Sequence, residues 1–187
     1  MKVVFVHGNG GCTADMHWYP QVAETLEQHG LQVVLTTFPD NEIAHQAVWL
    51  PFLRNDLQAG EDSILIGHSS GAIAAMRFAE QFPIIGSVIV AGYHTDLGMP
   101  DEREGGWFDT PWDWDAIRRN QQWIIQYASV DDPFIPIAEA RHVHEQLQTE
   151  YYEYTDENHF GGGGKRKTSF PELANAVLAK CQIQPGS

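Results

Sequence analysis

The residues from Gly67 to Gly71 read Gly-His-Ser-Ser-Gly, a G-x-S-x-G pattern whose central serine is Ser69. An apolar, β-branched run precedes the pattern and a small-residue segment of helical period follows it. The serine is therefore expected on a tight turn between a strand and a helix. Such a turn exposes a serine hydroxyl, and the flanking glycines leave room for close backbone neighbours. The pattern predicts a nucleophilic serine, the alternative being a turn that only reverses the chain.

A serine hydroxyl is a weak nucleophile unless a neighbouring base removes its proton. Where a G-x-S-x-G serine works with a triad, the chain order is serine, then acid, then histidine. Asp132 follows the strand-like segment 123–128, and His159 follows a weaker one, 151–154. We therefore expect a triad of Ser69, Asp132 and His159, each just past the carboxyl end of a strand, where such sheets bind ligands.

Two adjacent carboxylates, Asp131 and Asp132, compete for the role of the acid. Pro133 biases the backbone of Asp132 toward an extended conformation, which helps to aim its carboxylate at the histidine. We expect Asp132 to be the acid and Asp131 to be a turn residue that accepts backbone N–H groups or faces water.

A glycine-rich stretch, residues 8–11, follows His7 and the first apolar run. It resembles loops whose backbone N–H groups bind the oxyanion of a tetrahedral intermediate. We expect one donor to be the N–H of Ser70, directly after the nucleophile. The other is expected to be the N–H of Asn9, with Gly10 a close second. A dinucleotide site is disfavoured because the third glycine of G-x-G-x-x-G is missing.

The other polar clusters have simpler interpretations. Lys165 and Arg166 follow the glycine run 161–164, so the Walker pattern fails and a flexible basic loop beside His159 is expected. His68 lies inside the Gly67–Gly71 turn, called the nucleophile elbow, and is expected to pack there rather than act as a base. The remaining histidines show no ligand spacing, so no metal site is predicted. The triad chemistry needs no cofactor.

The segments that must position these residues alternate between strand and helix. Such alternation predicts a parallel sheet with helices on both faces. The expected strands are 3–6, 33–38, 64–66, 88–90, 123–128 and 151–154. The expected helices run from Tyr19 to a stop at Gly30, from an Asn41 cap through Trp49, over 72–82 and 137–147, and from a capping box at Ser169.

The segment 94–120 interrupts this alternation and shows no clear period. Segments of this length without regular structure are usually functional or mobile. Two compatible interpretations stay open: a surface excursion packed down by its own aromatic side chains, or a lid over the site. We expect Trp107, Trp112 and Trp114 to border the substrate pocket, because apolar walls usually line such sites.

The whole chain has 187 residues, of which 43% are hydrophobic and 11% aromatic, and a formal net charge of −14. The aromatic content argues against disorder, and the negative charge argues against a nucleic-acid partner. Cys12 and Cys181 predict free thiols rather than a disulfide framework. No signal peptide or membrane-length apolar stretch is visible, so we expect one cytoplasmic domain, 1–187, with no membrane partner.

The stretch 66–77 closely resembles the retinoblastoma-binding protein 9 family of small serine hydrolases. The resemblance covers nearly the whole chain and includes the segments 49–52, 96–98, 111–114 and 131–134. It implies an α/β-hydrolase fold, with a roughly six-stranded, mostly parallel sheet and no separate cap domain, and the same triad. It also implies hydrolysis of small esters or amides, with aminopeptidase-like activity reported for a family member.

Two departures from the family pattern bear on function. The family's namesake carries a Leu-x-Cys-x-Glu segment linked to binding of the retinoblastoma protein, whereas the matching stretch 57–61 has Ala59 in place of the cysteine. We therefore expect weak or absent binding to that protein. The glycine run 161–164 also looks longer than its counterpart, which would change the rim of the site.

Together these patterns predict a serine hydrolase that cleaves small-molecule esters or amides through an acyl-enzyme on Ser69. Two alternatives stay open. One is a protein-binding module on an inactive hydrolase scaffold, because a fold alone does not prove activity. The other is an acyltransferase, which needs an acceptor that outcompetes water.

Overall fold

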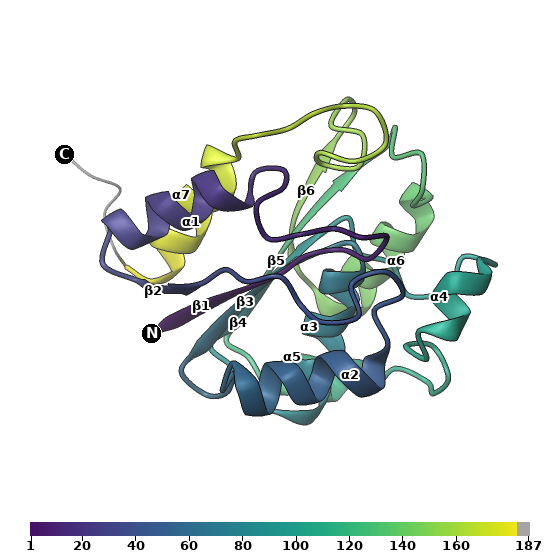
Figure 1. Ribbon diagram of the computed structural model, residues 1–187, viewed down its shortest axis with the longest axis horizontal. Helices are drawn as coiled ribbons and strands as arrows, with labels where there is room; N and C mark the ends of the chain where they lie inside the picture. The colour runs from purple at the N-terminus through teal and green to yellow at the C-terminus, as the bar shows by residue number, and fades with distance from the viewer. Residues whose placement is uncertain (183–187) are drawn as a thin grey trace.

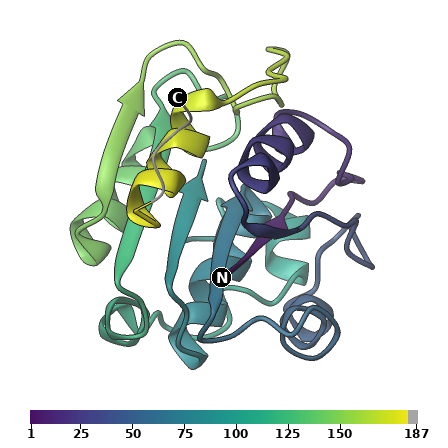
Figure 2. The same ribbon diagram turned by 90° about the vertical axis from the view of Figure 1, so that its left-hand side faces the viewer.

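The computed structural model describes residues 1–182, which form a sheet between two layers of helices (Figure 1, Figure 2). All strand pairings are parallel, and the order across the sheet is β2-β1-β3-β4-β5-β6. The predicted six-stranded architecture is thus confirmed. The strands are β1 (Lys2–Val6), β2 (Gln32–Val34), β3 (Ser63–His68), β4 (Gly86–Val90), β5 (Trp123–Ser129) and β6 (Glu150–Tyr154).

In the described chain, two helices cover one face of the sheet, and four helical segments cover the opposite face. The first pair is α1 (Tyr19–Gln28) and α7 (Pro171–Lys180). The second group is α2 (Gln46–Pro51) with a π-helical turn (Phe52–Asp56), α3 (Ser70–Gln81), α5 (Trp114–Arg119) and α6 (Ile137–Leu147). A short helix, α4 (Pro100–Glu104), lies in the connection between β4 and α5. Within the described chain, no helix has both the length and the apolar character needed to cross a bilayer.

The strand β1 shows why the buried strands read as continuous apolar runs. Val3 and Phe5 pack in the layer of α1 and α7, whereas Val4 and Val6 pack in the layer of α3. Successive side chains of a strand point to opposite faces, so a strand that is covered on both faces is apolar at most of its positions.

The order of the strands places two loops side by side at one edge of the sheet. From β1 the chain winds outward to β2 and then returns to β3, on the other side of β1. The loops that leave β1 and β3 therefore emerge from neighbouring strands at the carboxyl edge. This is the edge where open α/β sheets bind ligands.

Several element boundaries differ from the prediction. The strand β2 ends at Val34, and residues 39–43 form turns, so α2 begins only at Gln46. The side chain of Asn41 donates to the carbonyl of Cys12 at 2.7 Å instead of capping a helix. The predicted capping box at Ser169 is also wrong: Phe170 is the N-cap without a side-chain cap bond, and Pro171 begins the helix. Proline suits this position because it needs no N–H partner there.

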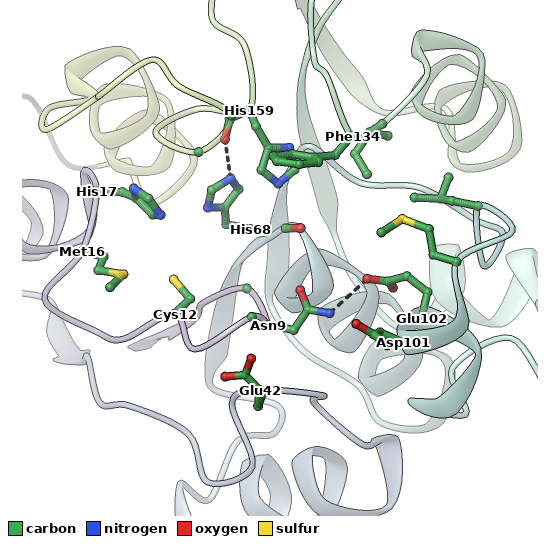
Figure 3. A pocket seen from close by; sticks show the side chains of 18 of the residues that line it. Asn9, Cys12, Met16, His17, Glu42, His68, Asp101, Glu102, Phe134 and His159 are labelled. Atoms are coloured by element: carbon green, nitrogen blue, oxygen red, sulfur yellow. Dashed lines mark hydrogen bonds between the residues drawn. The ribbon is translucent and has the colours of Figure 1, made fainter.

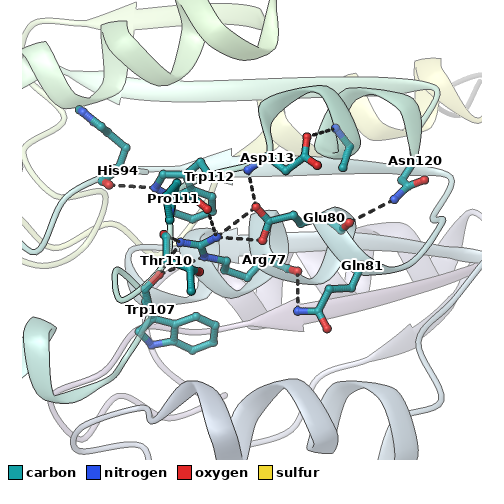
Figure 4. A network of polar contacts seen from close by, with 11 residues as sticks. Arg77, Glu80, Gln81, His94, Trp107, Thr110, Pro111, Trp112, Asp113 and Asn120 are labelled. Atoms are coloured by element: carbon teal, nitrogen blue, oxygen red, sulfur yellow. Dashed lines mark hydrogen bonds and ion pairs between the residues drawn. The ribbon is translucent and has the colours of Figure 1, made fainter.

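A buried arginine, Arg77 of α3, binds the connection between β4 and α5 (Figure 4). Its guanidinium donates to the carbonyls of Trp107 at 2.8 Å and Thr110 at 2.7 Å. It also pairs with Glu80 at 2.8 Å and lies 3.7 Å from the ring centroid of Trp112. The segment is therefore packed down on the helix that follows Ser69.

Candidate active site

Ser69 occupies the tight turn between β3 and α3, with φ +57° and ψ −122°. This conformation is strained for a residue with a side chain, and such strain gathers at functional sites. The N–H of Ser69 donates to the carbonyl of Val90 at 2.9 Å. A Cβ on Gly67 would lie 2.3 Å from the carbonyl oxygen of Gly71, and one on Gly71 would lie 1.9 Å from that of Val6. Both glycines are required because backbones pass this close.

Asp132 and His159 form a buried hydrogen-bonded pair. His159 Nδ1 lies 2.7 Å from Asp132 Oδ2, and the two side chains are only 9% and 2% exposed. An ionised carboxylate can only accept, so Nδ1 carries the proton and Nε2 is left as the basic nitrogen. The second oxygen of Asp132 accepts the N–H groups of Phe134 at 2.9 Å and Ile135 at 3.0 Å, which fix the carboxylate.

The neighbouring Asp131 is engaged elsewhere. Its Oδ1 accepts from the hydroxyl of Ser129 at 2.6 Å and from the N–H of Asn158 at 2.8 Å. The hydrogen bond from Ser129 lowers the pKa of Asp131, and that from Asn158 adds to the effect. Asp131 therefore ties the loop after β5 to the loop that carries His159, as expected of a turn residue.

Ser69 and His159 line the same cavity of about 430 Å³ at the carboxyl edge of the sheet (Figure 3). Apolar side chains from two loops form part of its wall, namely Leu97, Met99, Phe134 and Ile135. Phe134 also stands edge-on to the imidazole of His159, with ring centroids 5.0 Å apart. Among the lining residues of the described chain, the ionisable carboxylates are Glu42, Asp101 and Glu102, and lysine and arginine do not occur.

The loop after β1 lies against the elbow. A Cβ on Gly8 would lie only 3.4 Å from the Cβ of Ser69, and both Asn9 and Gly10 line the cavity. Ser70 is the first residue of α3, so its N–H has no partner within the helix. The N–H of Gly10, however, donates to the carbonyl of Glu42 at 2.9 Å. Gly10 is therefore not free to bind an oxyanion, contrary to the prediction.

His68 connects three segments beneath the cavity. Its Nε2 lies 2.9 Å from the carbonyl oxygen of His159, a bond that Figure 3 shows. Its Nδ1 lies 2.6 Å from the hydroxyl of Tyr19. A carbonyl only accepts, so Nε2 donates to it and Nδ1 accepts from Tyr19. Burial lowers the pKa of His68 well below its usual value, so the ring is neutral. His68 thus packs and holds the loop of His159.

The three tryptophans expected at the pocket do not line the cavity. Trp107 is buried and donates from Nε1 to the carbonyl of Ala44 at 2.6 Å. Trp112 donates to the carbonyl of His94 at 2.9 Å and stacks on Trp114 at 5.2 Å. Their indoles pack the segment against the protein, which corrects the prediction that they border the substrate pocket.

The glycine run 161–164 does reach the rim, because Gly162 and Gly163 line the cavity. Of the basic residues that follow it, Lys165 and Lys167 both pair with Glu157. Lys167 Nζ lies 3.0 Å from a carboxylate oxygen of Glu157 and 4.5 Å from the ring centroid of Phe170. The charge of Lys167 is thus paired within the protein, and Lys167 does not line the cavity.

Two further regions bear on partners. Within the described residues, no group of three or more histidine, cysteine or carboxylate side chains could hold a metal ion.

In the stretch 57–61, Ala59 is fully buried and its carbonyl accepts from Arg54 at 2.8 Å. The weak or absent binding of the retinoblastoma protein stays a prediction, and the burial of Ala59 is consistent with it.

Sequence reasoning missed the cavity residues Met99, Glu102 and Phe134. Phe134 had a usable signal, because it follows Asp132 by two residues and so stays close to the expected acid. Met99 and Glu102 had none, since the segment that carries them shows no hydrophobic period. Only the packing of that segment brings them to the cavity.

A strained serine after β3 and a buried histidine–carboxylate pair at the same edge of a parallel sheet define an α/β hydrolase without a separate cap domain in the described chain. The sequence matches the serine hydrolase family over residues 3–173, and the chain belongs to that family. It is 43% identical to the serine hydrolase RBBP9 of Rattus norvegicus over 178 residues, which cover 94% of this chain and 93% of the relative.

Solved structures share the fold at lower sequence identity. The ydeN gene product from B. subtilis is 22% identical with a TM-score of 0.84, and the similarity covers 97% of this chain and 98% of that one. Est1E from Butyrivibrio proteoclasticus, solved with ferulic acid, is 14% identical with a TM-score of 0.73, over 98% of this chain and 88% of that one. At these identities the similarity shows the fold alone.

Proposed function

We propose that the protein hydrolyses small-molecule esters or amides through an acyl-enzyme on Ser69, with Asp132 and His159 completing the triad. One observation carries this proposal: His159, paired with the buried carboxylate of Asp132 at 2.7 Å, lines the same cavity as a serine in a strained turn. Membership of the serine hydrolase family supports the same reaction class.

The geometry suits a two-step acyl transfer. His159 Nε2 takes the proton of Ser69 as Oγ attacks the carbonyl carbon, and Asp132 stabilises the imidazolium that forms. The N–H groups of Asn9 and Ser70 bind the oxyanion of the tetrahedral intermediate. The imidazolium then gives its proton to the leaving group. In the second step His159 activates a water molecule, which releases the acyl group from Ser69.

A fluorophosphonate probe, followed by intact-mass analysis and peptide mapping, tests the covalent site. We expect a single label on Ser69 in the wild-type protein and in Ser70→Ala. Ser69→Ala should fold normally, take no label and lose turnover by a factor on the order of 10⁶. A label retained by Ser69→Ala would overturn the assignment, and an unlabelled, inactive wild-type protein would favour the binding-module alternative.

The acidic lining of the cavity favours aminoacyl substrates over neutral acyl groups. Glu42 and Asp101 are exposed residues that line the cavity, and its described lining holds no lysine or arginine to oppose them. A positively charged α-ammonium group would be attracted to this lining, whereas an anionic acyl group would be repelled. This observation supports an aminopeptidase-like preference within the same mechanism.

An aminoacyl ester and its analogue without the amino group provide the matched pair for this preference. We expect the higher kcat/KM for the aminoacyl ester and a ratio that falls as salt is added, because exposed charges are screened. Glu42→Gln and Asp101→Asn should reduce the ratio. Equal values for the two substrates at low salt would assign the protein to the carboxylesterases instead.

A further inference from the structure

A single buried carboxylate, Glu102 of α4, connects the two sides of the proposed oxyanion site. Glu102 is only 8% exposed, and both of its oxygens accept hydrogen bonds. Asn9 Nδ2 donates to Oε1 at 3.0 Å, and the hydroxyl of Tyr93 donates to Oε2 at 2.5 Å (Figure 3 shows the bond to Asn9). Asn9 lies in the loop after β1, and Tyr93 lies shortly after β4.

The chain of hydrogen bonds continues from Tyr93 to the elbow. The hydroxyl oxygen of Tyr93 lies 3.3 Å from Ser70 Oγ. Tyr93 gives its own hydrogen to Glu102, so its oxygen accepts from the hydroxyl of Ser70. Burial, and then the adjacent Glu102, raise the pKa of Tyr93 well above its usual value, so this donor stays protonated. The bonds to an ionised carboxylate are also stronger than bonds between neutral groups.

We propose that Glu102 is a positioning residue for the oxyanion site. By binding the side chains of Asn9 and, through Tyr93, of Ser70, it holds the backbone N–H groups of these two residues in place. This inference rests on the proposed function, which assigns the oxyanion role to those amides. Glu102 fixes Asn9 directly, and it fixes the first turn of α3 through Tyr93. Docking of α4 on the elbow therefore completes the oxyanion site.

The two oxygens of Glu102 distinguish this role from direct binding of substrate. Both are already engaged within the protein, whereas Glu42 and Asp101 are exposed at the cavity. Glu102 is therefore expected to act on the chemical step and not on the binding of an ammonium group. Its removal should lower kcat and leave KM nearly unchanged.

A matched ester and thionoester separate this role from general support of the fold. The ester develops charge on oxygen, which N–H donors stabilise, whereas the thionoester develops it on sulfur, a weak acceptor. Loss of one well-placed oxyanion donor costs about 10²–10³ in kcat. For Glu102→Ala we expect a loss of roughly 10–100-fold on the ester and a several-fold smaller loss on the thionoester.

Two milder variants keep the test usable if Glu102→Ala does not fold. Glu102→Gln keeps the shape but turns an amide donor toward one of the two incoming donors. Tyr93→Phe keeps the ring and removes the hydroxyl that joins Glu102 to Ser70, with both of its hydrogen bonds. Both should show the same selective loss on the ester, at a smaller magnitude. Glu104→Gln is the matched control, because it makes the same change on α4 at a side chain that is 62% exposed; neither substrate should be affected.

Equal losses on ester and thionoester would overturn the inference and indicate a merely structural role. A rise in KM with kcat unchanged would overturn it in favour of direct substrate binding, and so would unchanged kinetics in folded Glu102→Ala. Failure of the proposed function gives a different result, because the wild-type protein would then neither turn over the ester nor react with the fluorophosphonate.

Discussion

Each residue of the proposed triad is held by contacts from outside the triad. Two backbone N–H groups fix the carboxylate of Asp132, and the neutral ring of His68 holds the carbonyl of His159. Ser69 is held by its own turn, because its N–H is bound to Val90 and its flanking glycines admit close backbone contacts. Such support matters because small displacements of reacting groups cost large factors in rate.

The two adjacent aspartates allow a direct comparison. Asp132→Asn keeps the shape of the acid but favours the wrong tautomer of His159, and this change costs about 10⁴ in kcat in the chymotrypsin-type triad. Asp131→Asn removes only an acceptor for Ser129 and Asn158, so we expect a loss of about tenfold or less. Steady-state kinetics with one ester, on variants shown to be folded by circular dichroism, check the ranking. The reverse order would transfer the acid role to Asp131.

Among the secondary-structure elements, the connection between β4 and α5 performs two separate tasks. Its aromatic part packs on α3, where Arg77 binds the carbonyls of Trp107 and Thr110. Its first part, with Leu97, Met99 and α4, lines the cavity instead. The excursion interpretation therefore applies to the aromatic part, whereas the first part lies beside the cavity; that it acts as a lid stays a prediction.

This division predicts different outcomes for two alanine variants. Trp107→Ala empties a buried site and should lower the free energy of unfolding by about 3–5 kcal/mol, with the preference for acyl-chain length unchanged. Met99→Ala removes a half-exposed side chain at the cavity and should change that preference while leaving Tm nearly unaltered. Chemical denaturation and a series of esters of increasing chain length measure both effects. A change of preference in Trp107→Ala alone would show that the indole reaches the substrate.

Buried histidines connect the stability of the whole molecule to pH. Burial lowers the pKa of His7, His17 and His68 from their ordinary value of 6.5. Below about pH 6.5 the unfolded chain therefore binds protons that the folded protein does not, and stability falls as the pH falls. The carboxylates affect stability at lower pH. Burial opposes ionisation of Glu139, but hydrogen bonds from His94 and Thr95 bring its pKa to about 2. The stability that Glu139 contributes is therefore lost only as the pH falls below its ordinary pKa of 4.5.

We therefore expect the free energy of unfolding to decrease between about pH 7 and pH 5. His68→Gln should make this dependence shallower, because glutamine can still donate to the carbonyl of His159 and does not titrate. Urea denaturation at three pH values across this range measures the slope. A flat profile in the wild-type protein, or an equal slope in the variant, would contradict this account.

The sequence by itself determined the sheet and the three residues expected to act in catalysis. Strands covered on both faces are apolar along most of their length, so their positions were visible in the chain, and the glycines beside Ser69 are required by local backbone geometry. Both signals are local, which is why Ser69 could be located and why the confirmed six-stranded parallel sheet could be predicted.

The tertiary structure alone decided which other residues reach the cavity. The indole of Trp107 is buried, those of Trp112 and Trp114 pack partly buried against the core, and Glu102 binds Asn9 of the oxyanion loop. These positions depend on how an aperiodic segment docks on α3. Likewise, the engagement of the Gly10 N–H with Glu42, and of Asn41 with Cys12, follows from contacts between loops. Such contacts join residues that are distant in the chain, and no local periodicity or spacing records them.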